Sequence, residues 1–257
     1  MNIWKWLLSW VFASIGANEV QAGILLTTGT YTQDFTILAS TGTSSVLPPE
    51  WLIAETDTNA NSTYIAGTGS STTGDTYSFG SSGSSERALG GLRSGTLVPM
   101  FGASFTNNGA STLSSIAISY TGEQWRLGAL NRADRLDFQF STNASSLTTG
   151  TWTDINVLDF TGPVSTGSTG ALDGNLPMNR LLVTGSLTSL DLSVGSTVWI
   201  RWQDFEATGS DDGLAIDDFS ATGSFAAVPE PSSMLLLGVA SSLAAVRALR
   251  AKKNRAS

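Results

Sequence analysis

Short runs in which apolar and polar residues alternate constrain the fold of the middle of the chain more than any other feature. The alternation is clearest in residues 116–120, 136–140 and 198–202, and Gly, Asn or Asp residues bound each run. Side chains two positions apart lie on one face of a strand, so each run predicts a half-buried strand. Many short strands joined by polar turns predict an all-β antiparallel sandwich over residues 23–226.

Two long stretches within this body consist mostly of Thr, Ser and Gly. They cover residues 56–85 and 162–174 and contain few apolar side chains. This composition predicts loops along the rim of the sandwich, where ligands often bind. A solvated connection without a ligand is the simpler interpretation of the same composition.

The chain contains no His and no Cys. These two absences exclude Ser-His-Asp and Cys-His catalysis, imidazole-bound zinc and a disulfide framework. The sequence also lacks the Glu-x-Asp-x-x-Glu pattern of lectin-like glucanases, a phosphate-binding loop, a serine nucleophile elbow and a metalloprotease motif. We therefore expect a protein without catalytic activity, and a glycoside hydrolase is the least favoured function.

Negative charge is concentrated in the body of the chain. Between residues 23 and 228 there are nineteen carboxylates, seven arginines and no lysine, which gives a net charge of −12. Nucleic-acid binding requires Lys and Arg to displace counterions from the phosphate backbone, so we expect no nucleic-acid partner. Five of the six remaining cations lie in the last eleven residues.

Residues 1–22 have the features of a secretory signal peptide. Lys5 and the terminal amine form a positively charged start, an apolar run over 6–15 follows, and small residues precede the junction of Ala22 and Gly23. We therefore expect cleavage after Ala22 and export of the rest of the chain.

The C-terminal end begins with a proline-containing linker and continues with an apolar segment. The linker, 227–233, contains Pro229, Glu230 and Pro231, and the apolar segment covers 234–249. As a helix, this segment would rise about 24 Å, close to the thickness of a bilayer core. The sequence therefore predicts one transmembrane helix.

A basic tail, 250–257, follows the predicted helix. Basic residues hold their end of a membrane helix in the cytoplasm, which would leave the acidic body outside. The order of the Pro-Glu-Pro tripeptide, the apolar segment and the basic tail resembles the PEP-CTERM sorting signal of Gram-negative bacteria. The resemblance covers the chain from Val228 to its end and includes every residue of the tripeptide.

The resemblance implies a partner and a destination. In that family an exosortase, an integral-membrane cysteine protease, recognises the segment and processes it after export. The protein would then lie in the inner membrane only transiently, before it reaches the cell surface or extracellular matrix. PEP-CTERM systems accompany exopolysaccharide production, so exopolysaccharide is an implied second partner.

Three segments of the body resemble concanavalin-A-like and MAM-like jelly-roll domains. They are 31–35, 47–51 and the closing segment 215–219, which reads Ala-Ile-Asp-Asp-Phe. The resemblance implies a jelly-roll sandwich ahead of the sorting signal, and it speaks to the fold more than to a ligand.

Two pairs of aspartates lie near the C-terminal end of the body. If residues 197–219 form a hairpin with its turn at 209–213, Arg201 lies opposite Asp217 or Asp218. Strand alternation places Asp218 on the face of the core, where a carboxylate needs a cation or several donors.

Two alternatives satisfy this requirement. In the first, Arg201 forms an ion pair with the inward Asp218, and Asp211 and Asp212 build a solvated turn. In the second, a structural Ca²⁺ bridges the first and last strands, because calcium takes six to eight oxygen ligands. Its predicted ligands are Asp34, Asp211, Asp212, Asp217 and Asp218.

These features favour a non-catalytic protein of the cell surface or extracellular matrix. Abundant Ser and Thr, an acidic body and a processing signal all fit this function. The alternative is a carbohydrate-binding, lectin-like module, in which an exposed aromatic ring stacks on a sugar. Trp199 is the predicted contact, because it lies on the strand face opposite Ile200 and Trp202.

Overall fold

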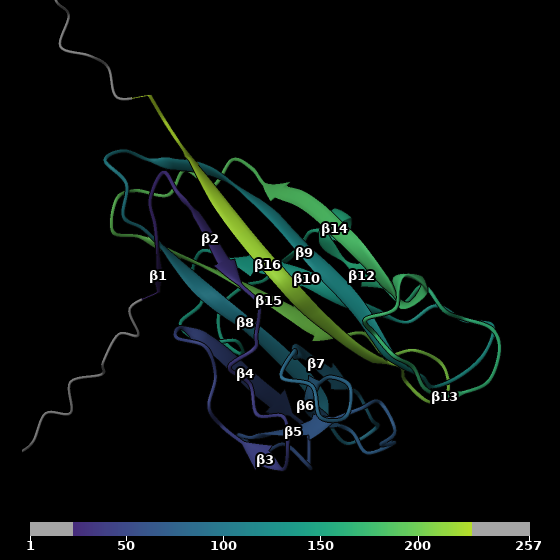
Figure 1. Ribbon diagram of the computed structural model, residues 1–257. Helices are drawn as coiled ribbons and strands as arrows, with labels where there is room; N and C mark the ends of the chain where they lie inside the picture. Colours follow the sequence, from purple (N-terminus) through teal and green to yellow (C-terminus); the bar gives the residue numbers. More distant parts are fainter. Residues whose placement is uncertain (1–22, 228–257) are drawn as a thin grey trace, which may run out of the picture.

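The computed structural model describes residues 23–227, which form two packed β-sheets (Figure 1). The predicted signal peptide at 1–22, the predicted transmembrane helix at 234–249 and the basic tail lie outside the described residues. Between residues 23 and 227, no helix has the length and apolar character needed to cross a membrane. The two-sheet architecture confirms the predicted all-β sandwich, and the jelly-roll topology stays a prediction.

The first sheet contains seven strands. Their bounds are β1 (Ile24–Leu26), β4 (Trp51–Thr56), β8 (Val98–Asn107), β10 (Arg135–Ser141), β11 (Thr153–Asp154), β12 (Phe160–Thr161) and β15 (Thr197–Asp204). The strand order is β1-β8-β15-β10-β11, with β4 also on β8 and β12 also on β10. The β1–β8 pairing is parallel and the others are antiparallel.

The second sheet contains nine strands. Their bounds are β2 (Thr30–Gln33), β3 (Thr43–Ser44), β5 (Tyr64–Gly67), β6 (Asp75–Phe79), β7 (Ala88–Leu92), β9 (Leu113–Leu127), β13 (Gly170–Ala171), β14 (Arg180–Leu187) and β16 (Gly213–Phe225). The order is β13-β9-β16-β7-β6-β5-β3, with β14 also on β9 and β2 also on β16. Two short 3-10 helices, η1 (Asn156–Leu158) and η2 (Pro177–Asn179), lie in the connections.

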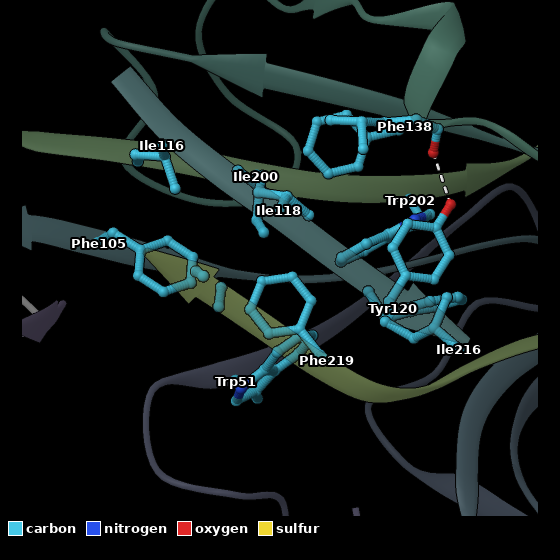
Figure 2. Close-up of a cluster of buried hydrophobic side chains, with 14 of the residues drawn as sticks. Trp51, Phe105, Ile116, Ile118, Tyr120, Phe138, Ile200, Trp202, Ile216 and Phe219 are labelled. Atoms are coloured by element: carbon cyan, nitrogen blue, oxygen red, sulfur yellow. Dashed lines mark hydrogen bonds between the residues drawn. The ribbon is translucent and has the colours of Figure 1, made fainter. Parts of the chain in front are cut away.

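The main core lies between the sheets and takes alternate residues from the long strands (Figure 2). The three runs predicted from their alternation are β9, β10 and β15, so the predicted strands are confirmed. Their buried core residues are Ile116, Ile118, Tyr120, Leu136, Phe138, Val198, Ile200 and Trp202.

Trp202 lies at the centre of this core, with aromatic neighbours in both sheets. From the first sheet, Trp51 stacks on it at 6.1 Å and Phe138 meets it edge-on at 5.1 Å between ring centroids. From the second sheet, Tyr120 approaches to 5.1 Å and Phe219 to 5.9 Å, both edge-on. Such pairs add to the free energy of area burial, so this ring couples the two sheets.

The predicted hairpin between residues 197 and 219 is wrong. β15 pairs with β8 and β10 in the first sheet, whereas β16 pairs with β9, β7 and β2 in the second. Residues 205–212 therefore cross from one sheet to the other. The apolar faces of the two strands meet across the core instead of lying side by side.

The stretch 56–85, predicted as a loop, contains β5 and β6. Its few apolar side chains, Tyr64, Ile65, Tyr77 and Phe79, lie in these strands, and their pairing supplies the order that composition did not indicate. The other predicted loop, 162–174, is irregular except for the two residues of β13.

The last strand, β16, changes neighbour part-way along its length, where a bulge interrupts it. One edge pairs with β9, and the other pairs with β7 at 214–216 and with β2 at 219–222 (Figure 1). Between these two pairings Asp218 has a left-handed backbone, with φ of 48°. The extra residue turns Asp218 to solvent and returns Phe219 to the core, so the predicted inward position of Asp218 is wrong.

Replacing Trp202 with alanine should lower the free energy of unfolding by about 3–5 kcal/mol, because it removes the ring that both sheets share. The melting temperature should fall by roughly 6–20 °C. Leu182→Ala is the control, because that side chain is 71% exposed and its loss should change stability by less than about 0.5 kcal/mol. Thermal unfolding measures both, and equal effects would contradict the assignment of Trp202 to the centre of the core.

Candidate functional site

The five aspartates predicted to bind Ca²⁺ lie in three places. Asp212 and Asp217 are five residues apart on extended chain, which separates them by about 17 Å. Asp34 and Asp218 do come together, since both line a surface pocket of about 300 Å³ at the end of β2. The predicted five-ligand site is therefore wrong, because neighbours in sequence are spread along one strand.

Three carboxyl groups from separate parts of the chain meet on the outer face of the second sheet. Glu123 lies in β9, Asp217 lies in β16, and Glu86 lies just before β7. Glu123 is opposite Ala215, so Asp217, two residues further along β16, points to the same face. The pairing of β7 with β16 brings Glu86 beside them.

The three groups are close together and largely buried. One carboxylate oxygen from each lies within 4.8 Å of the other two. Glu123 is 1% exposed, Asp217 is 6% exposed, and Glu86 is partly buried. We call Glu86, Glu123 and Asp217 the carboxylate cluster.

Each member of the carboxylate cluster keeps one oxygen free. Asn175 Nδ2 donates to Glu86 Oε2, and Trp125 Nε1 donates to Glu123 Oε2 at 2.9 Å. Within residues 23–227, the buried atoms Glu86 Oε1, Glu123 Oε1 and Asp217 Oδ1 have no hydrogen-bond partner. Among the residues that the structure describes, these three form a group that could hold a metal ion.

Burial controls the protonation of the cluster. Burial, reinforced by the neighbouring charges of Asp218 and Glu123, raises the pKa of Asp217 to about 9. Burial also raises the pKa of Glu123 to about 7, although the hydrogen bond from Trp125 lowers it. Asp217 therefore carries a proton at neutral pH unless a cation takes its place.

A row of aromatic rings packs on the same face of the sheet. Tyr77 stacks on Phe79 at 4.9 Å, and Phe79 stacks on Trp125 at 6.0 Å between centroids. All three are buried. They fix the surroundings of Glu123 and present no ring for stacking on a ligand.

A second acidic group lies where the chain crosses from β15 to β16, and it contains a cation of its own. Arg132 Nη1 lies 3.1 Å from Asp134 Oδ2, and its Nη2 lies 3.2 Å from Asp212 Oδ1. The backbone N–H of Asp212 donates to Asp134 Oδ2 at 2.6 Å. This group ties the crossing to the start of β10.

Asp204 is fully buried beside this second group. Its Oδ2 accepts the backbone N–H of Arg93 at 3.0 Å, and its Oδ1 has no partner in the described part of the chain. Burial raises the pKa of Asp204 well above its usual value, and the charges of Asp134 and Asp211 raise it further.

The predicted ion pair between Arg201 and Asp218 is not formed. Arg201 Nε donates to Gln139 Oε1 at 2.7 Å, its Nη1 donates to the carbonyl of Leu147, and its guanidinium lies 4.1 Å from the ring centroid of Trp152. The pair fails because β15 and β16 belong to different sheets, and because Asp218 faces solvent.

Trp199 lies on the outer face of the first sheet, as strand alternation predicts, since Ile200 and Trp202 face the core. It is nevertheless only 5% exposed. A sugar could not stack on a ring that is covered in this way, so the predicted contact residue is not available at the surface.

The predicted sorting residues Pro229, Glu230 and Pro231 lie outside the described residues, as does Ala22 of the predicted cleavage junction. Residues 227–253 match the family described as the PEP-CTERM protein-sorting motif. This chain carries a PEP-CTERM sorting signal. The signal implies export, processing at the membrane and recognition by an exosortase, and it confirms the resemblance seen in the sequence.

Comparison of this PEP-CTERM protein with solved structures gives matches of low identity. The CBM22-1 xylan-binding domain of Paenibacillus barcinonensis Xyn10C is 11% identical with a TM-score of 0.36, covering 79% of this chain and 99% of that one. The K2 cleaved adhesin domain of Lys-gingipain is 12% identical with a TM-score of 0.37, covering 76% and 99%. Similarity at this level carries no inference about a ligand. No curated protein matches the chain.

Sequence reasoning found Asp217 but missed Glu86 and Glu123. One local signal pointed to Glu123, because it shares a strand face with Trp125 and lies in a run that reads Tyr-Thr-Gly-Glu-Gln-Trp. An acidic residue on an apolar face needs a partner. Glu86 gave no such signal, since it precedes its strand.

Asp204→Asn should make stability less dependent on pH. A raised pKa means that the folded protein holds a proton that the unfolded chain loses above about pH 4, so wild-type stability falls as the pH rises. The melting temperature of the variant relative to wild type should therefore increase between pH 4 and pH 8.

Asp191→Asn is the matched control, because Asp191 is exposed and its left-handed backbone, φ 45°, suits Asn equally well. Its melting temperature relative to wild type should stay constant over the same range. A constant difference for Asp204→Asn as well would contradict the buried, protonated state of Asp204.

Proposed function

We propose that the chain is an exported, non-catalytic protein of the cell surface or extracellular matrix, which an exosortase processes at its PEP-CTERM signal. The position of the signal relative to the fold carries this proposal. β16 ends at Phe225, the N–H of Ala226 donates to the carbonyl of Thr112 at 2.8 Å, and the sorting motif begins at residue 227. The sandwich is complete where the signal starts, so cutting there would release an intact body.

The distribution of charge supports the same orientation. The body carries a net charge of −12, and the chain ends with a basic tail. Positive charge is retained on the cytoplasmic side of a membrane, so this order leaves the acidic body outside.

The chemistry of the body supports a non-catalytic role. The chain has no His and no Cys to act as base or nucleophile. Glu123 and Asp217 of the carboxylate cluster are buried, and so is the separate Asp204. Buried acids of this kind cannot meet a polymeric substrate.

The predicted sugar contact does not support the lectin-like alternative. Trp199, Trp125 and Trp202 are buried, and the partly exposed Trp152 packs one face of its ring against the guanidinium of Arg201. Stacking of a sugar requires an accessible ring face. We therefore give the matrix function priority over carbohydrate binding.

Replacing Pro229, Glu230 and Pro231 with alanines should leave export intact but retain the protein in the inner membrane. Export depends on the N-terminal signal, whereas release depends on the sorting motif. Cell fractionation followed by immunoblotting measures the distribution. Alanines at Ser232 and Ser233, directly after the motif, are the matched control and should leave release unchanged. Normal release of the triple variant would overturn the proposal.

The mature chain should begin at Gly23 and end near Glu230. Both processing signals predict this pair of ends, and intact-mass spectrometry of protein isolated from its native host measures them directly. A mature species that keeps residues 247–257 would show that the tail is a lasting anchor.

A further inference from the structure

The carboxylate cluster has ligand atoms that the rest of the protein does not use. One carboxylate oxygen of each residue lies within 4.8 Å of the others, and Glu86 and Glu123 each accept one hydrogen bond, from Asn175 and Trp125. We propose that this cluster binds one Ca²⁺ and that the ion fastens the outer face of the second sheet. This inference goes beyond the proposed function.

The geometry fits a cation of this size. Calcium binds oxygens at 2.3–2.6 Å, so two ligands on opposite sides of the ion are about 4.6–5.2 Å apart. The oxygens of the cluster lie within 4.8 Å of one another. At the full 4.8 Å separation, three oxygens lie about 2.8 Å from their common centre, so side-chain shifts of a few tenths of an ångström bring all three within reach of one ion.

The unpartnered oxygens point to a ligand independently of the acidity. Glu123 and Asp217 are more than nine-tenths buried, and in the described part of the chain Glu123 Oε1 and Asp217 Oδ1 have no hydrogen-bond donor. A buried carboxylate oxygen without a donor is costly, and native proteins rarely leave one unexplained. A bound cation would satisfy these oxygens together.

Arg180 and Arg87 attract Glu123 and Glu86 electrostatically, but neither arginine forms an ion pair with the carboxylate cluster. No salt bridge within residues 23–227 involves Glu86, Glu123 or Asp217. The neighbouring Arg87 donates hydrogen bonds from Nε and Nη2 to Ser78, and from Nη2 to the carbonyl of Gly67. Arg180, opposite Glu123 on β14, is exposed.

In the second acidic group, the chain itself provides a cation for the buried carboxylates. There Arg132 lies between Asp134 and Asp212 and contacts both. The carboxylate cluster has no arginine in the equivalent place, which indicates that its counter-charge comes from outside the chain.

The ligand atoms select the class of ion. Carboxylate oxygens suit hard cations, and a chain without His or Cys offers no soft ligand for zinc or copper. Calcium accepts irregular sites that water and carbonyl oxygens complete, whereas magnesium demands near-octahedral geometry. Extracellular calcium modules have dissociation constants of about 10⁻⁴–10⁻³ M, which sets the concentration range for a test.

The test uses the full chain, purified in detergent and freed of metal by chelation. Equilibrium dialysis against CaCl₂ should show uptake of one Ca²⁺ per chain. A hundredfold excess over the dissociation constant should raise the melting temperature by about 5–10 °C. Glu123→Gln and Asp217→Asn should each abolish uptake and this shift.

The variants separate binding from folding. Because Gln and Asn are neutral and have the shape of the protonated acids, both variants should melt in EDTA at or above the wild-type temperature, which shows that they fold. Asp218→Asn, one residue away but exposed, is the matched control and should keep full uptake. The proposal is overturned if wild type takes up no Ca²⁺ at 10 mM, if both ligand variants retain uptake, or if MgCl₂ gives the same shift.

Discussion

The pairing of β16 is the interaction on which the rest of the structure depends. It forms a ladder with β9 from Gly213 to Phe225 and joins β7 and then β2 on its other edge. Its inner face supplies Ile216 and Phe219 to the core, and its outer face supplies Asp217 to the carboxylate cluster. The bulge at Asp218 makes both possible, because it shifts the alternation by one residue between these positions.

The alternation of apolar and polar residues was enough to predict where strands lie and which of their faces is buried. The runs in β9, β10 and β15 bury the expected side chains because one face of each meets the core. Partners could not be predicted in the same way. The same order of apolar and polar residues fits both a hairpin and a crossing between two sheets. Only the pairing with distant strands distinguishes the two arrangements. For this reason the predicted pairing of β15 with β16 is wrong.

The candidate site shows the same limit. Acidic residues that are neighbours in sequence, such as Asp212 and Asp217, serve different groups, while Glu86, Glu123 and Asp217 meet from three strands or their ends. Clustering in the sequence therefore located acidic residues near the C-terminal end of the body, but it did not identify the residues that lie beside Asp217. The sorting signal was predictable in full, because its features follow one another without any long-range contact.

The central position of β16 also sets the time at which the body can fold. Within the described residues β2 pairs only with this last strand, and β9 and β7 each gain their second neighbour from it. In a chain that crosses a membrane from its N-terminus, this strand emerges last, immediately before the sorting signal. The last strand of the sandwich and the sorting signal therefore reach the outer face of the membrane together. A protease at that face meets its cleavage segment only when all strands of the body are available for folding.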